Sequence, residues 1–260
     1  MSKTLIMGVV NVTPDSFSDG GRFLNPQHAV DQVLRLVDQG ADIVDIGAES
    51  SRPGAELVSA DTEWTRLEPV LDKLFSRDIG CQISIDTNKD ETMLKLISTP
   101  VSIINDIKGG ASTQTLKALA ACPLTYIAMH MHRKPATMQI DPLDGLQAVA
   151  KVEAFYASTQ LRLNECGFSN DRIWLDPGIG FGKTDQANIA LIKSSINKAA
   201  IWPLVVGVSR KSFIGRILGI DDPLERDNPS KMLELALMLA PIKAIRTHDV
   251  AKLRALRDLL

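Results

Sequence analysis

The sequence has no long hydrophobic run and little cysteine, and each absence argues against a class of protein. Every apolar run falls well short of the roughly 18 residues needed to span a membrane, and the N-terminal run is too short for a signal peptide. The three cysteines, Cys81, Cys122 and Cys166, lie far apart and form no CxxC pair, so we expect reduced thiols. We therefore expect a cytoplasmic protein that does not associate with membranes.

The sequence also lacks an excess of charge of one sign. Its 29 basic and 31 acidic residues give a net charge of −2, and no long single-sign run occurs. This balance argues against a nucleic-acid-binding surface, although it leaves room for a local anion pocket. With 45% hydrophobic and 23% charged residues and no linker along its 260 residues, the chain is expected to form one globular domain, residues 1–260.

Short apolar runs alternate with longer amphipathic segments along the whole chain. Eight runs have the length and Ile/Val content of buried strands: residues 4–10, 42–47, 82–86, 102–107, 124–130, 173–178, 203–209 and 244–249. Segments with helical character follow them at 29–40, 60–75, 90–98, 113–121, 144–167, 186–199, 230–240 and 250–260. Pro69 is expected to delay the start of the second helix or to kink it.

Eight β-then-α units in about 260 residues predict a single (β/α)8 TIM barrel. A doubly wound open sheet has the same alternation but usually fewer strands. In either fold ligands bind at the loops that follow the carboxyl ends of the strands, so the residues at those ends are the candidates for binding and catalysis.

Polar side chains follow nearly every predicted strand. Helix N-caps explain an occasional Asp, Asn or Ser there, but carboxylates, amides and cations at nearly every end exceed what capping requires. These residues include Asn11, Glu49, Asp86, Asn105, His130, Asp176, Lys211, Arg246 and His248.

Two subsets of these residues each suit a particular kind of ligand. Asp86, Asn105 and Asp176 suit a planar heterocycle with adjacent N–H and NH2 groups, because a carboxylate can accept from both at once, although each alone is also a plausible cap. Arg246 and His248 lie two apart on one strand face, which predicts an anion or diphosphate site; a buried Arg–Asp pair is the alternative.

Three further sequence features leave their alternatives open. Lys211 either stabilises negative charge at a pocket mouth or is a solvated loop lysine. The stretch DPGIGFGKT fails both the P-loop and the dinucleotide pattern, so its glycines indicate a tight turn. His130 and His132 share a face, but no other residue is placed to complete a zinc set.

Eight stretches occur together in an order that resembles the dihydropteroate synthases of the pterin-binding TIM-barrel family. They are MGVVNVTPDSFSDGG, GADIVDIGAESSRPGA, ISIDT, IINDI followed by GG, the MHM of AMHMHRKPATMQ, LDPGIGFGKT, VGVSRKSFIG and IRTHDV. They extend from residue 7 to residue 250.

The resemblance implies a transferase reaction of folate biosynthesis. It joins 6-hydroxymethyl-7,8-dihydropterin diphosphate to 4-aminobenzoate, giving 7,8-dihydropteroate and diphosphate. It also implies Mg2+ on the diphosphate, competition by sulfonamides, and a homodimer. Diphosphate departure is expected to precede arylamine attack, because the electron-rich dihydropterin ring can share the positive charge left on its methylene carbon.

The resemblance also assigns roles to residues. The pterin is implied to contact Asp86, Asn105, Asp176, Lys211, Met129, Ile107, Gly207 and Phe181. The diphosphate is implied to contact Asn11, Arg246 and His248, with Asn11 also at the metal. The aminobenzoate is implied to contact Ser51, Arg52, Pro53, Phe17 and Ser212. Lys211, Arg246, His248 and Asp176 are the implied catalytic residues.

Two further expectations follow from the family pattern. Thr247, which stands where Val is usual, should face the helices rather than the pocket. The loop 11–21 should close over the barrel mouth together with the SSRPG loop, with Phe17 against the aminobenzoate ring.

Two other functions remain as alternatives. A methyltransferase barrel of the same family, which passes a methyl group from methyltetrahydrofolate to a corrinoid, would not need SRKSF, the Arg246–His248 pair or TPDSF. A non-catalytic pterin-binding protein would not need to keep Asn11, Lys211, Arg246 and His248.

Overall fold

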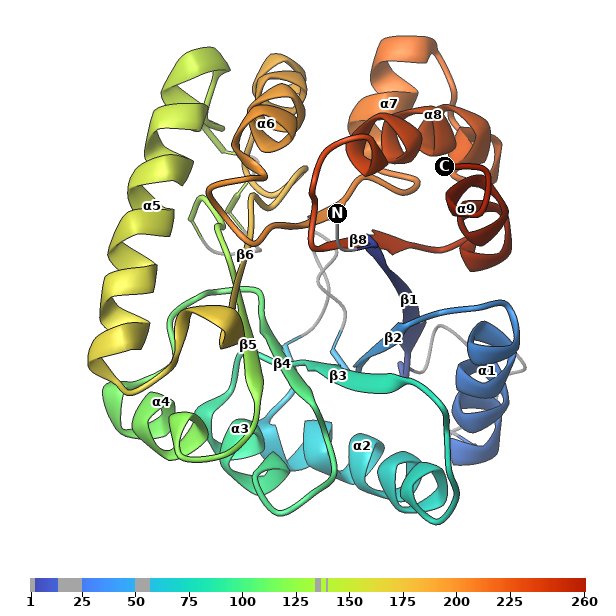
Figure 1. The fold of residues 1–260 in the computed structure, drawn as a ribbon, viewed down its shortest axis with the longest axis vertical. Helices are drawn as coiled ribbons and strands as arrows, with labels where there is room; N and C mark the ends of the chain where they lie inside the picture. The colour runs from blue at the N-terminus through green and yellow to red at the C-terminus, as the bar shows by residue number, and fades with distance from the viewer. Residues whose placement is uncertain (1–2, 14–24, 50–56, 134–136, 139) are drawn as a thin grey trace.

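A computed structural model describes residues 3–13, 25–49, 57–133, 137–138 and 140–260. Within these ranges the chain alternates strand and helix from end to end (Figure 1). The strands are β1 (Leu5–Asn11), β2 (Ile43–Gly47), β3 (Gln82–Asp86), β4 (Ile103–Asp106), β5 (Thr125–Met129), β6 (Ile173–Asp176), β7 (Val205–Gly207) and β8 (Ala244–Thr247). All eight predicted strands are confirmed, with ends that move by a few residues.

The strands described form one parallel sheet in the order β6-β5-β4-β3-β2-β1-β8-β7. The two edge strands meet through a parallel bridge between Leu175 and Leu204, where the Leu175 N–H donates to the Pro203 carbonyl at 3.0 Å. The sheet therefore curves into a nearly closed barrel. The TIM-barrel prediction is confirmed over the open doubly wound sheet.

Helices cover the outer face of the barrel (Figure 1). They are α1 (Pro26–Asp38), α2 (Ala60–Phe75), α3 (Asp90–Leu96), α4 (Thr113–Ala120), α5 (Gly145–Glu165), α6 (Asp185–Lys198), α7 (Ser212–Leu218), α8 (Asp227–Met238) and α9 (Val250–Arg257). The eight predicted helices are present. Helix α7 was not predicted, because its seven residues are too few to show helical periodicity.

Helix α2 corrects the expectation about Pro69. The helix starts at Ala60 and Pro69 lies inside it, so the predicted late start is wrong. Ser59 fixes the start, because its hydroxyl accepts from the Thr62 N–H at 3.1 Å. Proline removes one backbone donor, and the burial of Leu67, Val70 and Leu71 beside it offsets that loss.

The barrel interior changes from apolar to polar along its axis. One cluster of buried side chains lies apart from the larger strand–helix core and consists of Met7, Ile43, Ile103, Ile127, Trp174, Val205 and Ala244. Side chains two residues apart on a strand share a face. The next inward positions after four of these residues are Asp45, Asn105, Asp176 and Arg246. The fold thus places these four polar side chains in the upper barrel interior, above an apolar floor.

The three cysteines are unpaired, as predicted. Among the helices of the described ranges, none is long and apolar enough to cross a membrane.

Candidate functional site

Residues at the carboxyl ends of neighbouring strands form one row across the sheet. Asn11 pairs with Gly47, Gly47 with Asp86, and Asp86 with Asn105. A Cβ atom built on Gly47 would lie 3.4 Å from the Asp86 Cβ and 3.8 Å from the Asn11 Oδ1. The side chains of Asn11 and Asp86 therefore flank the space above Gly47, and three predicted ligands come together at the barrel mouth.

Asp45, which the sequence analysis did not single out, is the centre of the buried polar layer. Its Oδ1 accepts from the Ser84 hydroxyl at 2.7 Å and its Oδ2 from the Asn105 Nδ2 at 2.9 Å. The Arg246 Nε lies 3.5 Å from the same Oδ2. The only sequence signal for Asp45 was an acidic residue inside an apolar strand run, away from the strand end.

The contact with Asp45 fixes what Asn105 presents to a ligand. Asn105 is buried, and its Nδ2 is committed to the carboxylate. Its Oδ1 is buried and has no hydrogen-bond partner. A buried amide oxygen without a partner is costly, so this atom is an acceptor suited to a ligand that carries an N–H group.

Arg246 lies between two buried carboxylates. Its Nη2 is 3.1 Å from the Asp176 Oδ2, and Asp45 lies on its other side. The Arg–Asp pair that the sequence left as an alternative is therefore present. The Arg246 Nε and Nη2 and the Asp176 Oδ2 nevertheless lack hydrogen-bond geometry, so these atoms keep bonding capacity for a ligand.

The charges at the mouth shift one another. Burial, and then the charge of Asp45, raise the pKa of the Asp86 carboxyl well above its ordinary value, with Arg246 opposing them. Burial disfavours the charged form of Arg246, but the carboxylates of Asp176, Asp45 and Asp86 outweigh it and raise its pKa. The guanidinium therefore stays charged, and Asp86 holds a proton more readily than an exposed carboxyl does.

Lys211 lies directly before α7 and faces the same mouth. Its Nζ is 4.4 Å from the centroid of the Phe181 ring. A Cβ built on Gly180, which has φ +86°, would approach the Lys211 Cδ to 3.4 Å. Burial and the nearby charge of Arg246 lower the pKa of Lys211 to about 8, against the attraction of Asp176 and Asp86. Lys211 is therefore half-buried against the Phe181 ring rather than extended into solvent.

His248 lies at the rim rather than among the carboxylates. Its backbone N–H and its ring Nδ1 lie 3.2 and 3.0 Å from the Ser209 hydroxyl, and much of the residue is exposed. Partial desolvation, and then the charges of Arg210 and Lys211, lower the pKa of His248 to about 4. The neighbouring Arg210 turns away to Asp227 on α8, at 2.7 and 3.0 Å.

The remaining predicted residues lie in the barrel interior, at the protein surface or outside the described residues. Ile107 and Met129 are buried at the ends of β4 and β5, and Gly207 pairs with Arg246. Ser212 is exposed, and its hydroxyl accepts from the Arg216 Nη1 at 3.1 Å. The predictions for Phe17, Ser51, Arg52 and Pro53, and for the closing loop 11–21, fall partly or wholly outside the described residues.

Thr247 faces the helices, as predicted. Its hydroxyl accepts from the Nζ of Lys231 on α8 at 2.7 Å, and Lys231 also pairs with Glu234 at 2.7 Å. This buried polar contact connects β8 to α8 directly beside Arg246. The side chain therefore supports the strand without reaching the mouth.

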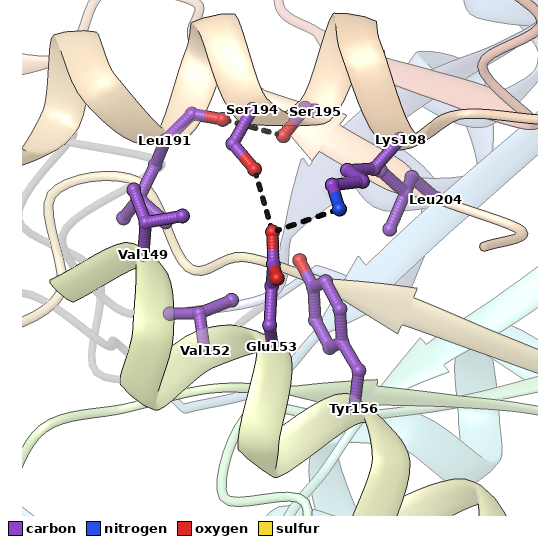
Figure 2. Close-up of a pocket in the computed structure, with 9 residues that line it drawn as sticks. All are labelled: Val149, Val152, Glu153, Tyr156, Leu191, Ser194, Ser195, Lys198 and Leu204. Carbon is purple, nitrogen blue, oxygen red and sulfur yellow. Dashed lines mark hydrogen bonds and ion pairs between the residues drawn. The ribbon is translucent and has the colours of Figure 1, made fainter. Parts of the chain in front are cut away.

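Two hollows lie away from the mouth. A cavity of about 10 Å³ between α5 and α6 is lined by Glu153, Tyr156, Lys198 and neighbouring apolar side chains (Figure 2). It is large enough for about one water molecule. A shallow groove of about 790 Å³ includes Asp42 and Gln82, at the amino ends of β2 and β3. Neither hollow contains the residues that converge at the mouth.

Metal ligands of the usual kind do not gather in the described ranges, where no three His, Cys, Asp or Glu side chains could hold an ion together. Asn11 is exposed at the end of β1. Its amide oxygen is a suitable hard ligand for Mg2+ when a phosphorylated substrate supplies most of the coordination.

Comparison with known proteins decides the family. The family model described as "Pterin binding enzyme" matches residues 7–248. The chain belongs to the pterin-binding enzyme family. The resemblance found from the eight stretches is thereby confirmed.

Several relatives of this pterin-binding enzyme are dihydropteroate synthases that match it over nearly their whole length. The chain is 40% identical over 255 residues to dihydropteroate synthase of Neisseria meningitidis serogroup C, covering 96% of this chain and 89% of the relative. It superimposes on Xanthomonas albilineans dihydropteroate synthase with 4-aminobenzoic acid with a TM-score of 0.89, at 33% identity, covering 99% and 92% of the two chains. A Yersinia pestis dihydropteroate synthase in a sulfonamide drug complex also gives 0.89, at 34% identity, covering 99% and 93%. The chain is a transferase of the dihydropteroate synthase type.

Proposed function

We propose that the mouth of the barrel joins 6-hydroxymethyl-7,8-dihydropterin diphosphate to 4-aminobenzoate, forming 7,8-dihydropteroate and releasing diphosphate. The observation that carries this proposal is the set of acceptors in the upper interior. The Asn105 Oδ1 is buried and lacks a hydrogen-bond partner. The Asp176 Oδ2 is ion-paired with the Arg246 Nη2 at 3.1 Å but not in hydrogen-bond geometry with it, and Asp86 lies beside Asn105 in the sheet. A pterin ring presents N–H and NH2 donors along one edge, so it satisfies these atoms together.

The rest of the pterin half-site supplies contacts to the flat ring. Met129, Ile107 and Phe181 provide apolar surface, and Gly207 leaves the space beside Arg246 free of a side chain. A Cβ on Gly207 would approach the Arg246 Cβ to 3.4 Å. Lys211 donates to the oxygen or nitrogen atoms of the ring.

Diphosphate binds at the positive side of the mouth. Arg246 is charged and has free bonding capacity at Nε and Nη2, and His248 and Asn11 complete the set at the rim. Asn11 is the residue that would hold Mg2+, which when bound neutralises charge on the leaving group. Arg246 and His248 donate hydrogen bonds to the departing oxygens.

The reaction proceeds by departure of diphosphate followed by attack of the arylamine. The electron-rich dihydropterin ring shares the positive charge left on the methylene carbon. The carboxylates of Asp176 and Asp45, which lie beside Arg246, are on the side of the guanidinium where the ring is proposed to bind. The arylamine is already a nucleophile, so the protein positions it and excludes water. This route needs no covalent intermediate with a side chain.

The aminobenzoate side consists of Ser51, Arg52, Pro53, Phe17 and Ser212, and sulfonamides compete there. The sulfonamide complex of the Yersinia pestis relative supports this part of the proposal. Ser51 stands where Thr is common in the family, so one methyl contact to these ligands is lost.

Diphosphate release tests the proposed reaction directly. The full-length protein is incubated with dihydropterin diphosphate and Mg2+, with and without 4-aminobenzoate, and released diphosphate is measured. We expect release that requires the arylamine and that stops with excess EDTA. Binding of the pterin without arylamine-dependent release would favour the non-catalytic alternative, and methyl transfer from methyltetrahydrofolate would favour the methyltransferase alternative.

Lys211 gives the reaction a pH limit. Its pKa of about 8 predicts that kcat/KM for dihydropterin diphosphate falls as pH rises through this value, because the ammonium loses its charge. The pH profile of kcat/KM reports the free enzyme. Lys211→Arg keeps the charge and should remove this fall; an unchanged profile in that variant contradicts the role of Lys211.

A homodimer and a cytoplasmic location complete the proposal. Apolar side chains are exposed on α7, on the following 3-10 turn Leu224–Arg226, on α8 and at the residue that caps α8, and they support a protein interface. They are Ile217, Leu218, Leu224, Met232 and Leu239. Analytical ultracentrifugation of the wild-type chain and of Met232→Glu measures the oligomeric state: a dimer weakened by the substitution is expected, and a wild-type monomer contradicts it.

A further inference from the structure

A buried lysine holds the turn that follows β6. Lys183 is 2% exposed. Its Nζ donates to the carbonyls of Gly178 at 2.8 Å, Phe181 at 2.9 Å and His130 at 3.1 Å. All three hydrogens of the ammonium are thus used within the protein. The group points into the turn, so it cannot act as a phosphate-binding lysine in this arrangement.

A buried asparagine on α6 holds the same turn from the other side. Asn188 is fully buried, and its Oδ1 accepts from the Gly180 N–H at 2.7 Å. Its Nδ2 lies 3.4 Å from the Lys183 carbonyl. The first turn of α6 therefore anchors the middle of the loop, while Lys183 anchors both of its ends.

The turn also presses against the end of β5. Gly178 has φ +63°, and a Cβ there would lie 2.0 Å from the His130 carbonyl oxygen. Gly182 has φ +68°, and a Cβ there would lie 2.6 Å from the His132 carbonyl oxygen. Only glycine allows this approach. The turn has little room to shift, and its position depends on the polar contacts beneath it.

The turn fixes three members of the pterin half-site. The Gly178 N–H donates to the Asp176 Oδ1 at 2.7 Å, so the other carboxylate oxygen is left to face Arg246 and the mouth. Phe181 lies on the turn, and its ring is the surface on which the Lys211 Nζ rests at 4.4 Å. A displaced turn would therefore rotate Asp176 and move both Phe181 and Lys211.

We propose that Lys183 and Asn188 are positioning residues of the pterin half-site, which they serve by fixing the Gly178–Gly182 turn. The inference rests on the proposed function, because it assigns Asp176, Phe181 and Lys211 to the pterin. It predicts a selective effect. Loosening the turn weakens binding of dihydropterin diphosphate and leaves the aminobenzoate side in place.

The test compares Lys183→Met and Asn188→Leu with the wild type. Both substitutions keep side-chain size and remove the polar anchor. We expect KM for dihydropterin diphosphate to rise at least about tenfold in Lys183→Met, because one hydrogen bond between the pterin and a charged side chain would be misplaced. The rise in Asn188→Leu should be smaller. KM for 4-aminobenzoate should stay within about twofold of the wild-type value. Calorimetric titration with dihydropterin diphosphate alone should show the same loss of affinity.

A variant on the same helix provides the matched control. Leu191 is buried on α6, three residues after Asn188, and lines the small cavity facing α5 (Figure 2); it is not among the residues whose side chains hydrogen-bond to the turn. Leu191→Ala should lower the melting temperature and leave both KM values unchanged. This control separates the effect of lower protein stability from the effect of a displaced Gly178–Gly182 turn.

Three outcomes would overturn the inference. They are an unchanged pterin KM in folded Lys183→Met, an equal rise of both KM values, and a selective pterin effect in Leu191→Ala. If Lys183→Met does not fold, Asn188→Leu decides by the same criterion. Failure of the proposed function is distinguishable, because the wild-type chain would then release no diphosphate in response to the arylamine.

Discussion

Asp176→Ala is expected to abolish measurable turnover while the chain remains folded. The substitution removes the buried acceptor proposed for the pterin edge and the carboxylate nearest to the Arg246 Nη2, at 3.1 Å. Loss of a preorganised group of this kind lowers kcat by about 100- to 1,000-fold, and loss of the ring contact adds a binding defect. The measurement is diphosphate release in the presence of 4-aminobenzoate.

The chain should tolerate this change. Asp45 stays beside Arg246 at 3.5 Å, so the guanidinium keeps one counter-charge. The stability cost is then no more than about 3–5 kcal/mol, the cost of breaking a buried ion pair, against the roughly 5–15 kcal/mol typical of a folded protein. Asp171 provides the control, because it is an exposed aspartate in the turn just before the amino end of the same strand. Asp171→Ala should keep full activity. Near-normal turnover in folded Asp176→Ala would reject the assignment of the pterin site.

Asp45→Asn is expected to have the second-largest effect, although Asp45 is not proposed to touch either substrate. An asparagine there carries an NH2 group in place of one acceptor oxygen. To avoid facing the Asn105 Nδ2, which now donates at 2.9 Å, one of the two amides must turn. If Asn105 turns, it presents a donor to the donor edge of the pterin, and Arg246 also loses one counter-charge.

We expect kcat/KM for dihydropterin diphosphate to fall about 100-fold, because a buried acceptor for the pterin is replaced by a donor next to charged groups. KM for 4-aminobenzoate should change little. Ser84→Ala is the matched control, because it removes only the partner of the Asp45 Oδ1 and leaves Asn105 in place. An equal loss of activity in both variants would show that the orientation of Asn105 is not the cause.

The barrel could be predicted from the sequence because its signals are local. Eight apolar runs of strand length alternate with amphipathic segments, and each run needs only its own residues to be recognised. Caps at Ser59, Ser112 and Thr184 likewise act within three residues. Where the local signal is weak the prediction failed: α7 is too short to show a period, and Pro69 does not delay α2, since tertiary burial outweighs a lost backbone bond.

Part of the site was also predictable, because it lies at strand ends. Asn11, Asp86, Asn105, Asp176 and Lys211 all stand at or just beyond the carboxyl end of a predicted strand. The topology of a parallel barrel brings all such ends to one face. The inward direction of Arg246 and the outward direction of Thr247 follow from the two-residue period of a strand.

The sequence by itself determined the alternation of strands and helices, the barrel, the family and the face on which the site lies. Only the tertiary structure decided the partners: Asp45 holding Asn105 and Arg246, Lys183 turned into its own loop, and Arg210 drawn away to Asp227. These contacts join residues up to 201 positions apart, as Asp45 and Arg246 are. A residue's type does not specify which distant donor or acceptor will reach it, because buried polar groups take whatever partner the packed fold brings within hydrogen-bond distance.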